Sequence, residues 1–280
     1  LFSGCALRIL NLGLFRRAAM SRVMVPLDGV VFRPMANIKN LRKKESLYRD
    51  SINALCGLLE KNSFVRLANS PSLVDVRPFT QRGWNAKIHY TYILPLANVT
   101  LSSYTMNMRY LIRRARKHNI SVERSDDAKD YFELYNSMLL RKSASPTSPR
   151  MLSFFQRVVE LLSQKKIGEL WFAKTPSGEK AAGLIVIFHN KRAYGWSAAS
   201  NGELLHTAAP SLLMHEVIQR LRVQFSEFDM GGADFPEIHS HSAGYNPQLI
   251  PGYEVEKSSI GAGICYAIAK KLLSKGSSAF

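Results

Sequence analysis

Apolar residues recur at every third or fourth position in several segments of the chain, which is the spacing of an amphipathic helix. This pattern predicts a helix from about Ile38 to Lys61. It predicts a second helix that ends near Lys117 and that Ser102 or Ser103 can cap at its N-terminus. Further helices are expected to begin at Ser125-Asp126-Asp127, Ser148-Pro149 and Pro210, and another is expected over 262–274.

Other segments alternate apolar and polar residues, as half-buried strands do, and Lys87–Ile93 is the clearest example. Between the expected helices that begin at Ser148-Pro149 and at Pro210, Pro176-Ser177-Gly178 and His189-Asn190-Lys191 separate strand-like segments, so we expect a β-meander there. The strands are expected at 5–12, 22–33, 63–68, 87–93, 170–174, 181–188, 192–198, 228–230 and 253–258. This order of elements indicates an α/β protein and not a repeat array.

The composition fits a folded protein with a basic surface. Of the 280 residues, 46% are hydrophobic, which is enough for a buried core in one large domain or two moderate ones. The 38 Lys and Arg residues outnumber the 21 Asp and Glu residues, and the net charge is +17. Such a charge attracts nucleic acid, nucleotide phosphates or an anionic membrane surface, although a basic surface by itself identifies no partner.

The cysteines and the N-terminal segment bear on the compartment. Cys5, Cys56 and Cys265 form no C-x-x-C pair and no metal-ligand spacing, which favours free thiols in a reducing compartment. The chain begins with Leu1, so we expect the natural start to be missing. Two targeting interpretations of the N-terminal segment are open: a lipoprotein cleavage site at Phe2-Ser3-Gly4-Cys5, and a mitochondrial presequence, because the segment 1–27 has no acidic residue. Both are less favoured than a segment that belongs to a folded domain. No apolar run reaches the roughly 18–20 residues of a membrane span, so a soluble, cytoplasmic protein is expected.

Four segments between Thr91 and Tyr253 form an ordered set. They are Thr91–Leu96 with Met108–Ala115, Ala181–Val186 with Ala193–Ser200, Phe228-Asp229-Met230-Gly231-Gly232, and Gly244-Tyr245-Asn246 with Tyr253. In this order they resemble the Fem-like family, which contains the peptidoglycan-bridge aminoacyltransferases and their relatives with the GNAT fold. The likeness is good over about residues 85–258 and loose over 22–84.

The resemblance implies a fold, a domain organisation and an activity. The fold would be α/β and GNAT-like (acyl-CoA N-acyltransferase), with a truncated first subdomain at 1–98 and a complete second subdomain at 99–280. The activity would be transfer of an acyl or aminoacyl group from aminoacyl-tRNA or acyl-CoA to an amine, such as that of a cell-wall precursor or other sugar nucleotide. The donor would be a co-substrate, so no tightly bound cofactor is expected. The GNAT pyrophosphate motif Q/R-x-x-G-x-G/A is absent, which disfavours ordinary acetyl-CoA.

The helix that ends near Lys117 carries candidate substrate-binding residues. Arg109, Arg113, Arg116 and Lys117 lie on one face of it and form either a phosphate anchor or a solvated surface. The resemblance favours Arg109 and Arg113 as contacts to substrate phosphate. On the meander, the two-residue spacing of Tyr194 and Trp196 points both side chains to one face of the sheet, where they line an acceptor pocket or a hydrophobic core. Ser197 and Tyr245 lie in the family-like segments and complete the candidate substrate site.

Candidate catalytic residues follow the predicted strand end at Gly231-Gly232. Aminolysis of an acyl ester needs a base and a group that stabilises the developing negative charge. The candidate bases are Asp229, Asp234, Glu237, His239 and His241, each of which taken alone can also be an ordinary loop residue. The pair His239 and His241 lacks a third ligand nearby, so no metal site is expected.

The chain departs from the family pattern at one position. The family usually has Phe-Lys before its Gly-Tyr/Phe-Asn motif, where this chain has His241-Ser242. Ser242 cannot carry the positive charge of that lysine, so a protonated His241 or Arg113 is expected to replace it. The alternative is a catalytically inactive GNAT-like module that binds an anionic nucleotide or nucleic acid. The active-site hypothesis requires the arginine-bearing helix and the loop after Gly231-Gly232 to face one groove.

Overall fold

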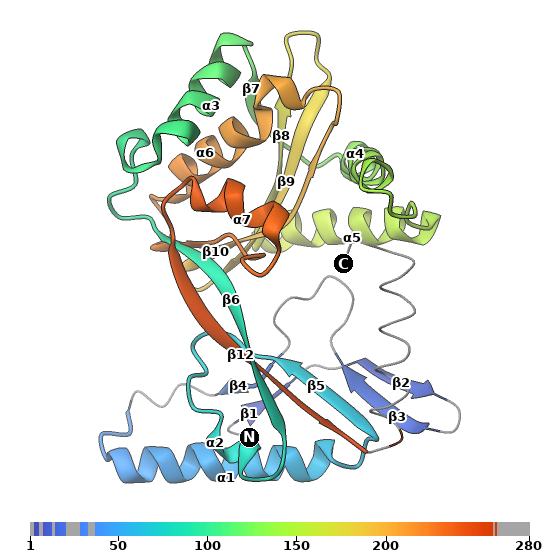
Figure 1. Ribbon diagram of the computed structural model, residues 1–280, viewed down its shortest axis with the longest axis vertical. Coiled ribbons are helices and arrows are strands. Elements are labelled where there is room, and N and C mark those ends of the chain that lie inside the picture. Colours follow the sequence, from blue (N-terminus) through green and yellow to red (C-terminus); the bar gives the residue numbers. More distant parts are fainter. Residues whose placement is uncertain are drawn as a thin grey trace. The chain divides into compact units, whose positions relative to one another are not determined.

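The structure is a computed structural model that describes residues 3–5, 8–12, 15–20, 29–32, 37–259 and 261 (Figure 1). The predicted helix 262–274 with Cys265, and most of the predicted strand 22–33, lie outside these residues. The described residues form two compact units, one of them Tyr90–Ile250 and the other the residues up to His89 with those from Pro251. The sequence predicted a single division between 98 and 99, whereas the compact units divide at His89 and the chain returns to the first unit at Pro251.

The first unit is built around the long helix α1 (Leu41–Leu59), which confirms the helix predicted there. The Asn40 side chain caps this helix by accepting a hydrogen bond of 2.9 Å from the Lys43 backbone N–H. Strand β5 (Phe64–Ala68) pairs antiparallel with β12 (Gln248–Ser258) and parallel with β3 (Phe15–Met20). The smaller elements are β1 (Ser3–Gly4), β2 (Arg8–Leu12), β4 (Val31–Phe32) and α2 (Arg77–Thr80). Buried residues of α1, α2, β5 and β12, including Ile52, Cys56, Phe79 and Leu67, form its core.

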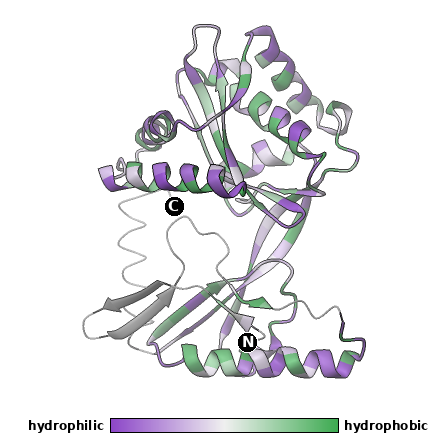
Figure 2. Ribbon diagram, turned by 180° about the vertical axis from the view of Figure 1, so that it is seen from behind, coloured by the Kyte–Doolittle hydropathy of each residue, from purple (hydrophilic) through white to green (hydrophobic). Residues whose placement is uncertain are grey.

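A curved sheet is the centre of the second unit. The strands predicted at 170–174, 181–188 and 192–198 are β8 (Gly168–Lys174), β9 (Lys180–His189) and β10 (Arg192–Ser200), and they pair antiparallel as the predicted meander. The outer strand β7 (Ser121–Ser125) pairs with β8. At the other side of the meander, β11 (Glu227–Asp229) pairs parallel with β10 and antiparallel with β6 (Asn85–Pro95). Most residues of β8 and β9 are buried, and both strands are largely apolar (Figure 2).

Helices cover both faces of this sheet (Figure 1). On one face lie α3 (Met106–Lys117) and α6 (Ala209–Leu221), which contact each other, and on the other face lie α4 (Ala128–Arg141) and α5 (Pro149–Lys165). The predicted caps Ser102 and Ser103 lie instead in the short 3-10 helix η1 (Leu101–Ser103), and Thr105 caps α3 by accepting from Met108 N–H. Thr105 also donates to the Gly244 carbonyl through its hydroxyl, so a distant contact fixes where α3 begins.

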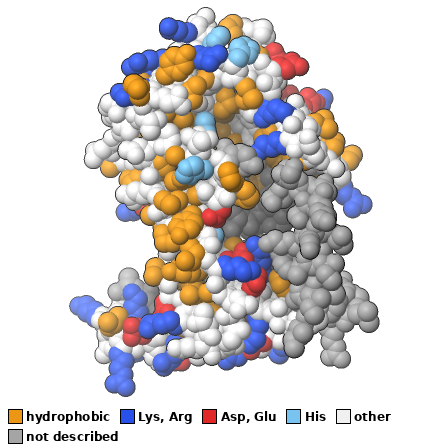
Figure 3. Space-filling model, in the orientation of Figure 1, with side chains coloured by type: hydrophobic (Ala, Val, Ile, Leu, Met, Phe, Trp, Pro, Cys, Tyr) orange, Lys and Arg blue, Asp and Glu red, His pale blue; other side chains and the backbone are white. Residues whose placement is uncertain are grey.

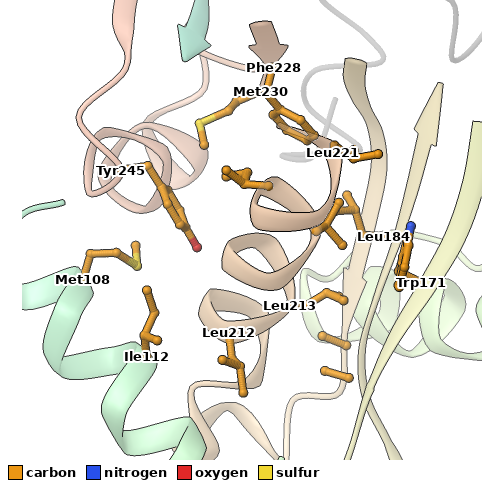
Figure 4. Packing of buried hydrophobic residues seen from close by; sticks show 14 of the residues in the cluster. Met108, Ile112, Trp171, Leu184, Leu212, Leu213, Leu221, Phe228, Met230 and Tyr245 are labelled. Atoms are coloured by element: carbon orange, nitrogen blue, oxygen red, sulfur yellow. The ribbon is translucent and has the colours of Figure 1, made fainter. Parts of the chain in front are cut away.

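A buried cluster joins α3 and α6 to the sheet (Figure 4). Met108 and Ile112 of α3, Leu212 and Leu213 of α6, and Phe228 of β11 all belong to it and are 3% exposed or less. The ring of Tyr245 points between the two helices and is fully buried. Tyr245 follows α7 (Pro236–Ala243), a helix that the sequence did not predict. The cluster therefore holds α7 and the segment after it against α3 and α6.

Candidate functional site

Strands β10 and β11 part at the residues that precede the Gly231-Gly232 bend. They pair in parallel only from Arg192 with Glu227 to Tyr194 with Asp229. Beyond this point β11 ends, whereas β10 continues to Ser200 with an irregularity between Gly195 and Ser197. Where two strands part, backbone N–H and C=O groups lose their ladder partners and become available to a ligand.

Asp229 lies at this point and is only 4% exposed. Its carboxylate accepts hydrogen bonds of 2.5 Å from the Thr91 hydroxyl and 2.9 Å from the Gly231 N–H, and the Arg192 guanidinium lies 3.9 Å away. Burial raises the pKa of the Asp229 carboxyl above its ordinary value, against the effect of these bonds. The carboxylate therefore holds the bend in place and has an increased affinity for a proton.

The bend requires glycine at both positions, because Gly231 and Gly232 have φ values of 60° and 61°. A Cβ atom on Gly231 would meet no atom within 4 Å, whereas one on Gly232 would lie 2.9 Å from Cδ1 of Ile238. Gly231→Ala is therefore expected to reduce the free energy of unfolding by about 1–2 kcal/mol through backbone strain alone. Gly232→Ala should cost more than its neighbour, because Ile238 must also move. Urea unfolding of the two variants measures this difference, and equal losses would contradict the packing of α7 on the bend.

Tyr194, Trp196 and Ser197 lie on the side of the sheet that α4 and α5 cover. The Arg192 guanidinium lies over the Tyr194 ring, 5.9 Å from its centroid. Trp196 packs against Phe154 and Phe155 of α5, with ring centroids 6.2 and 6.4 Å apart. Ser197 is buried and accepts a hydrogen bond of 2.6 Å from the Tyr131 hydroxyl of α4. Trp196 and Ser197 thus take part in interior packing, and Tyr194 alone of the three lies directly beside Asp229.

His241, Ser242 and Tyr245 lie on the side of the sheet that carries α3 and α6. Nε2 of His241 is 3.2 Å from the Ser211 hydroxyl, and its ring lies 5.5 Å from the Tyr245 ring. Burial lowers the pKa of His241, so its imidazole is neutral at pH 7 and does not supply the charge of the family lysine. Ser242 is 5% exposed, and its carbonyl accepts the Tyr245 N–H. The hydroxyl of the fully buried Tyr245 donates to the Ser211 carbonyl at 3.0 Å.

The arginine-bearing helix α3 does lie beside the segment that follows the bend. Its cap residue Thr105 donates its N–H to the Gly244 carbonyl at 3.0 Å, and a Cβ atom on Gly244 would lie 2.7 Å from Cε of Met108. The contact uses the apolar face of α3, whereas Arg113 is exposed and Arg109 half-buried. Lys and Arg side chains gather over α3 on the visible surface of the second unit (Figure 3). The candidate residues thus lie on two sides of the sheet, with Asp229 at the point where the strands part.

Three features of this region were not predicted from the sequence. The Tyr92 hydroxyl lies 2.5 Å from Nδ1 of His239, and the N–H of Tyr90 donates to the Asp234 carboxylate. Thr91, between them, holds Asp229. The alternating pattern of β6 was the available signal, because it places Tyr90 and Tyr92 on one face. The side chain of Glu237 lies outside the described part of the structure, and the described residues hold no group of three potential metal ligands.

The comparisons with known proteins agree with this architecture. Residues 102–237 match a family model described as an acetyltransferase (GNAT) domain. The structure is similar to the crystal structure of FemX, with a TM-score of 0.68 and 14% identity over 90% of this chain and 83% of that chain. It is also similar to the C-terminal domain of a putative lysylphosphatidylglycerol synthetase from Agrobacterium fabrum, with a TM-score of 0.63 and 13% identity over 93% of this chain and 83% of that one. For L-PGS from Bacillus licheniformis the TM-score is 0.60 and the identity 12%, over 94% and 84% of the two chains.

These findings confirm the GNAT-like α/β fold and, at the level of fold, the resemblance to Fem-type proteins. No protein of curated function matches the chain in sequence. The matched domain contains Arg109, Arg113, Tyr194 and Asp229, and it supports N-acyl or aminoacyl transfer at the level of the family. Within the described residues, none of the helices combines the length and the apolar character that a bilayer crossing requires.

Proposed function

We propose that the protein is an N-acyltransferase or aminoacyltransferase that moves an acyl group from aminoacyl-tRNA or acyl-CoA to an amine. One observation carries this proposal. The match to a GNAT domain spans the point at which β10 and β11 part, and a buried carboxylate of raised pKa, Asp229, lies there. The amine of a sugar-nucleotide cell-wall precursor is our candidate acceptor. The donor is a co-substrate, no tightly bound cofactor is required, and we assign the reaction to the cytoplasm, where the buried thiol of Cys56 stays reduced.

In this reaction the amine nitrogen forms a bond to the acyl carbon, and the bond from that carbon to the carrier oxygen or sulfur breaks. One proton leaves the nitrogen and one is delivered to the carrier. Holding the two substrates in contact can supply about 7–11 kcal/mol of the barrier reduction. Arg109 and Arg113 are the proposed contacts to donor phosphate, because guanidinium groups bind phosphate with two parallel hydrogen bonds. Asp229 positions the bend and Tyr194 lies beside it.

A catalytically inactive module that binds an anionic nucleotide or nucleic acid is the second candidate. Two observations favour it. Five of the 12 residues of α3 are Arg or Lys, and neither the neutral His241 nor the buried Ser242 supplies the positive charge expected from the family. Such a module would bind tRNA with a strong salt dependence but transfer nothing.

The experiment that tests the proposed function measures acyl transfer from labelled donors. The complete chain is incubated with aminoacyl-tRNAs or a panel of acyl-CoAs and a mixture of primary amines, and labelled amide is quantified. We expect amide with at least one donor class, and we expect Asp229→Asn to lower kcat/KM about tenfold, or about 1.4 kcal/mol. The matched control is Asp126→Asn, which changes an exposed carboxylate before α4. Binding of tRNA or nucleotide without any amide product would favour the inactive module instead.

A further inference from the structure

The exposed imidazole of His239 in α7 has one ring nitrogen beside a tyrosine hydroxyl of β6 and the other facing solvent. Nδ1 of His239 lies 2.5 Å from the Tyr92 hydroxyl, and the two rings are 5.8 Å apart. Tyr92 itself is 5% exposed, and its carbonyl accepts the N–H of Met230, the residue directly after β11. The Tyr92 backbone therefore lies beside the residue that follows β11, and the burial of its ring holds the hydroxyl against His239. Among the described residues, Nε2 of His239 has no hydrogen-bond partner, and the side chain faces solvent.

Large apolar side chains surround this imidazole on the surface of the second unit. Phe235 and Ile238 precede His239 by four residues and by one, and they are 47% and 38% exposed. On β6, Tyr90 shares the face of Tyr92 and is 40% exposed. The Asp234 carboxylate joins the two elements by accepting the Tyr90 N–H at 3.0 and 3.2 Å. Hydrophobic side chains gather over β6 and α7 in the space-filling view (Figure 3).

The charged and aromatic groups of this patch favour a cationic ligand. The chain as a whole carries a net charge of +17, yet the acidic side chain that the described residues place in the patch is that of Asp234. A carboxylate has about four acceptor positions, so Asp234 can bind a cation while it holds Tyr90. Exposed aromatic rings such as those of Tyr90 and Phe235 attract an ammonium group through their π faces. An ammonium on an apolar body therefore fits the patch, whereas a phosphate or another anion does not.

We propose that Tyr90, Asp234, Phe235 and Ile238 bind a primary amine carried on an aromatic or other apolar group, and that His239, held by Tyr92, removes its proton. The inference rests on the proposed transferase function and identifies the acceptor class and the base. In the tautomer required, Nδ1–H donates to the Tyr92 oxygen and Nε2 bears the lone pair. Nε2 of His239 first takes one proton from the bound ammonium and releases it to solvent, which leaves a neutral amine. As this nitrogen attacks the acyl carbon, a second proton passes to Nε2 and then to the departing oxygen or sulfur of the carrier, so the products are an amide, the protonated carrier and one proton in solvent.

The binding half of the proposal is tested without any acyl donor. Titration calorimetry measures the affinity of the complete chain for 2-phenylethylamine, ethylamine and 2-phenylethanol. We expect the first to bind at least tenfold more tightly than the other two, and we expect Phe235→Ala to remove this preference. His189→Gln, which changes an exposed histidine on the β9–β10 turn, should bind like the original protein. Equal affinity for the three probes, or an unchanged preference in Phe235→Ala, would overturn the site.

The catalytic half is tested with the donor that supports transfer. His239→Gln should lower kcat about 100-fold and leave the KM for the amine within about twofold. Tyr92→Phe should reduce kcat less, because the imidazole stays but loses its orienting partner, and His189→Gln should have no effect. An active protein whose rate does not depend on His239 would overturn the assignment of the base and leave the transferase function intact. Absence of transfer in the original protein would instead remove the transferase function, and the calorimetry would still decide the amine site.

Discussion

Replacing Tyr245 with alanine is expected to lower the free energy of unfolding by about 3–5 kcal/mol. The side chain is fully buried between α3 and α6, where its ring packs edge-on against Tyr104 at 5.1 Å and lies 5.5 Å from the His241 ring. Alanine would leave a cavity bordered by Met108 and would also remove the hydrogen bond to the Ser211 carbonyl. α7 would then lose the ring contact between His241 and Tyr245.

Two variants separate these contributions. Tyr245→Phe keeps the ring and removes only the hydroxyl, so we expect a loss of about 1 kcal/mol. Tyr110→Ala removes a tyrosine ring that is 59% exposed on α3, and the change should stay within about 0.5 kcal/mol of zero. Urea unfolding followed by circular dichroism measures all three. A loss below about 1 kcal/mol for Tyr245→Ala would contradict the buried position of this ring and would leave Tyr245 open to the substrate-binding role that the family resemblance suggested.

Local patterns were sufficient for most of the fold. The strands of the meander, α1 and α4–α6 follow from the period of apolar residues, which directly reports which face is buried. Helix α7 did not follow, because its eight residues are too few to show a period and its first residue, Pro236, also suggests a turn. The cap of α3 was placed at Ser102 or Ser103 for a related reason. Thr105 gains its advantage from Gly244, which is 139 residues away along the chain.

The candidate site was harder to predict, because the sequence does not show on which side of the sheet each candidate residue lies. Sequence spacing identifies which residues of a single strand share a face, as it did for Tyr90 and Tyr92. It does not identify which face of β10 corresponds to which face of α3, and so the sequence left open whether Trp196 lines an acceptor pocket or a hydrophobic core. The packing of Trp196 on Phe154 and Phe155 of α5 agrees with the second alternative. The link from Thr91 to Asp229 spans 138 residues and also required the strand order.

The second large effect is expected from pH. Burial lowers the pKa of both His215 and His241 in the folded protein below the ordinary value of 6.5. The unfolded chain therefore binds more protons than the folded one below about pH 6.5, and the free energy of unfolding must fall as the pH falls through this range. Well above pH 6.5 both states carry neutral imidazoles, and these residues contribute no slope. Well below pH 6.5, a histidine that stays neutral in the folded protein contributes a slope of up to about 1.4 kcal/mol per pH unit.

The groups around the two histidines determine how this slope is measured. Glu216 opposes the decrease in the pKa of His215, whereas Arg116 adds to it, and the Tyr104 hydroxyl lies 3.3 Å from Nδ1. Asp229 has the opposite effect on the free energy of unfolding as the pH falls, because its raised pKa makes the folded protein, and not the unfolded chain, bind the additional proton. Asp229 can therefore offset part of the stability that the histidines lose. Unfolding curves at pH 5.0–8.0 are therefore compared with those of the double variant His215→Gln and His241→Gln, in which Asp229 is unchanged. The difference in slope below pH 6.5 reports the histidines alone. Parallel curves would mean that both imidazoles become protonated equally in the folded and unfolded states, which the packing of His241 against Tyr245 and Ser211 does not permit.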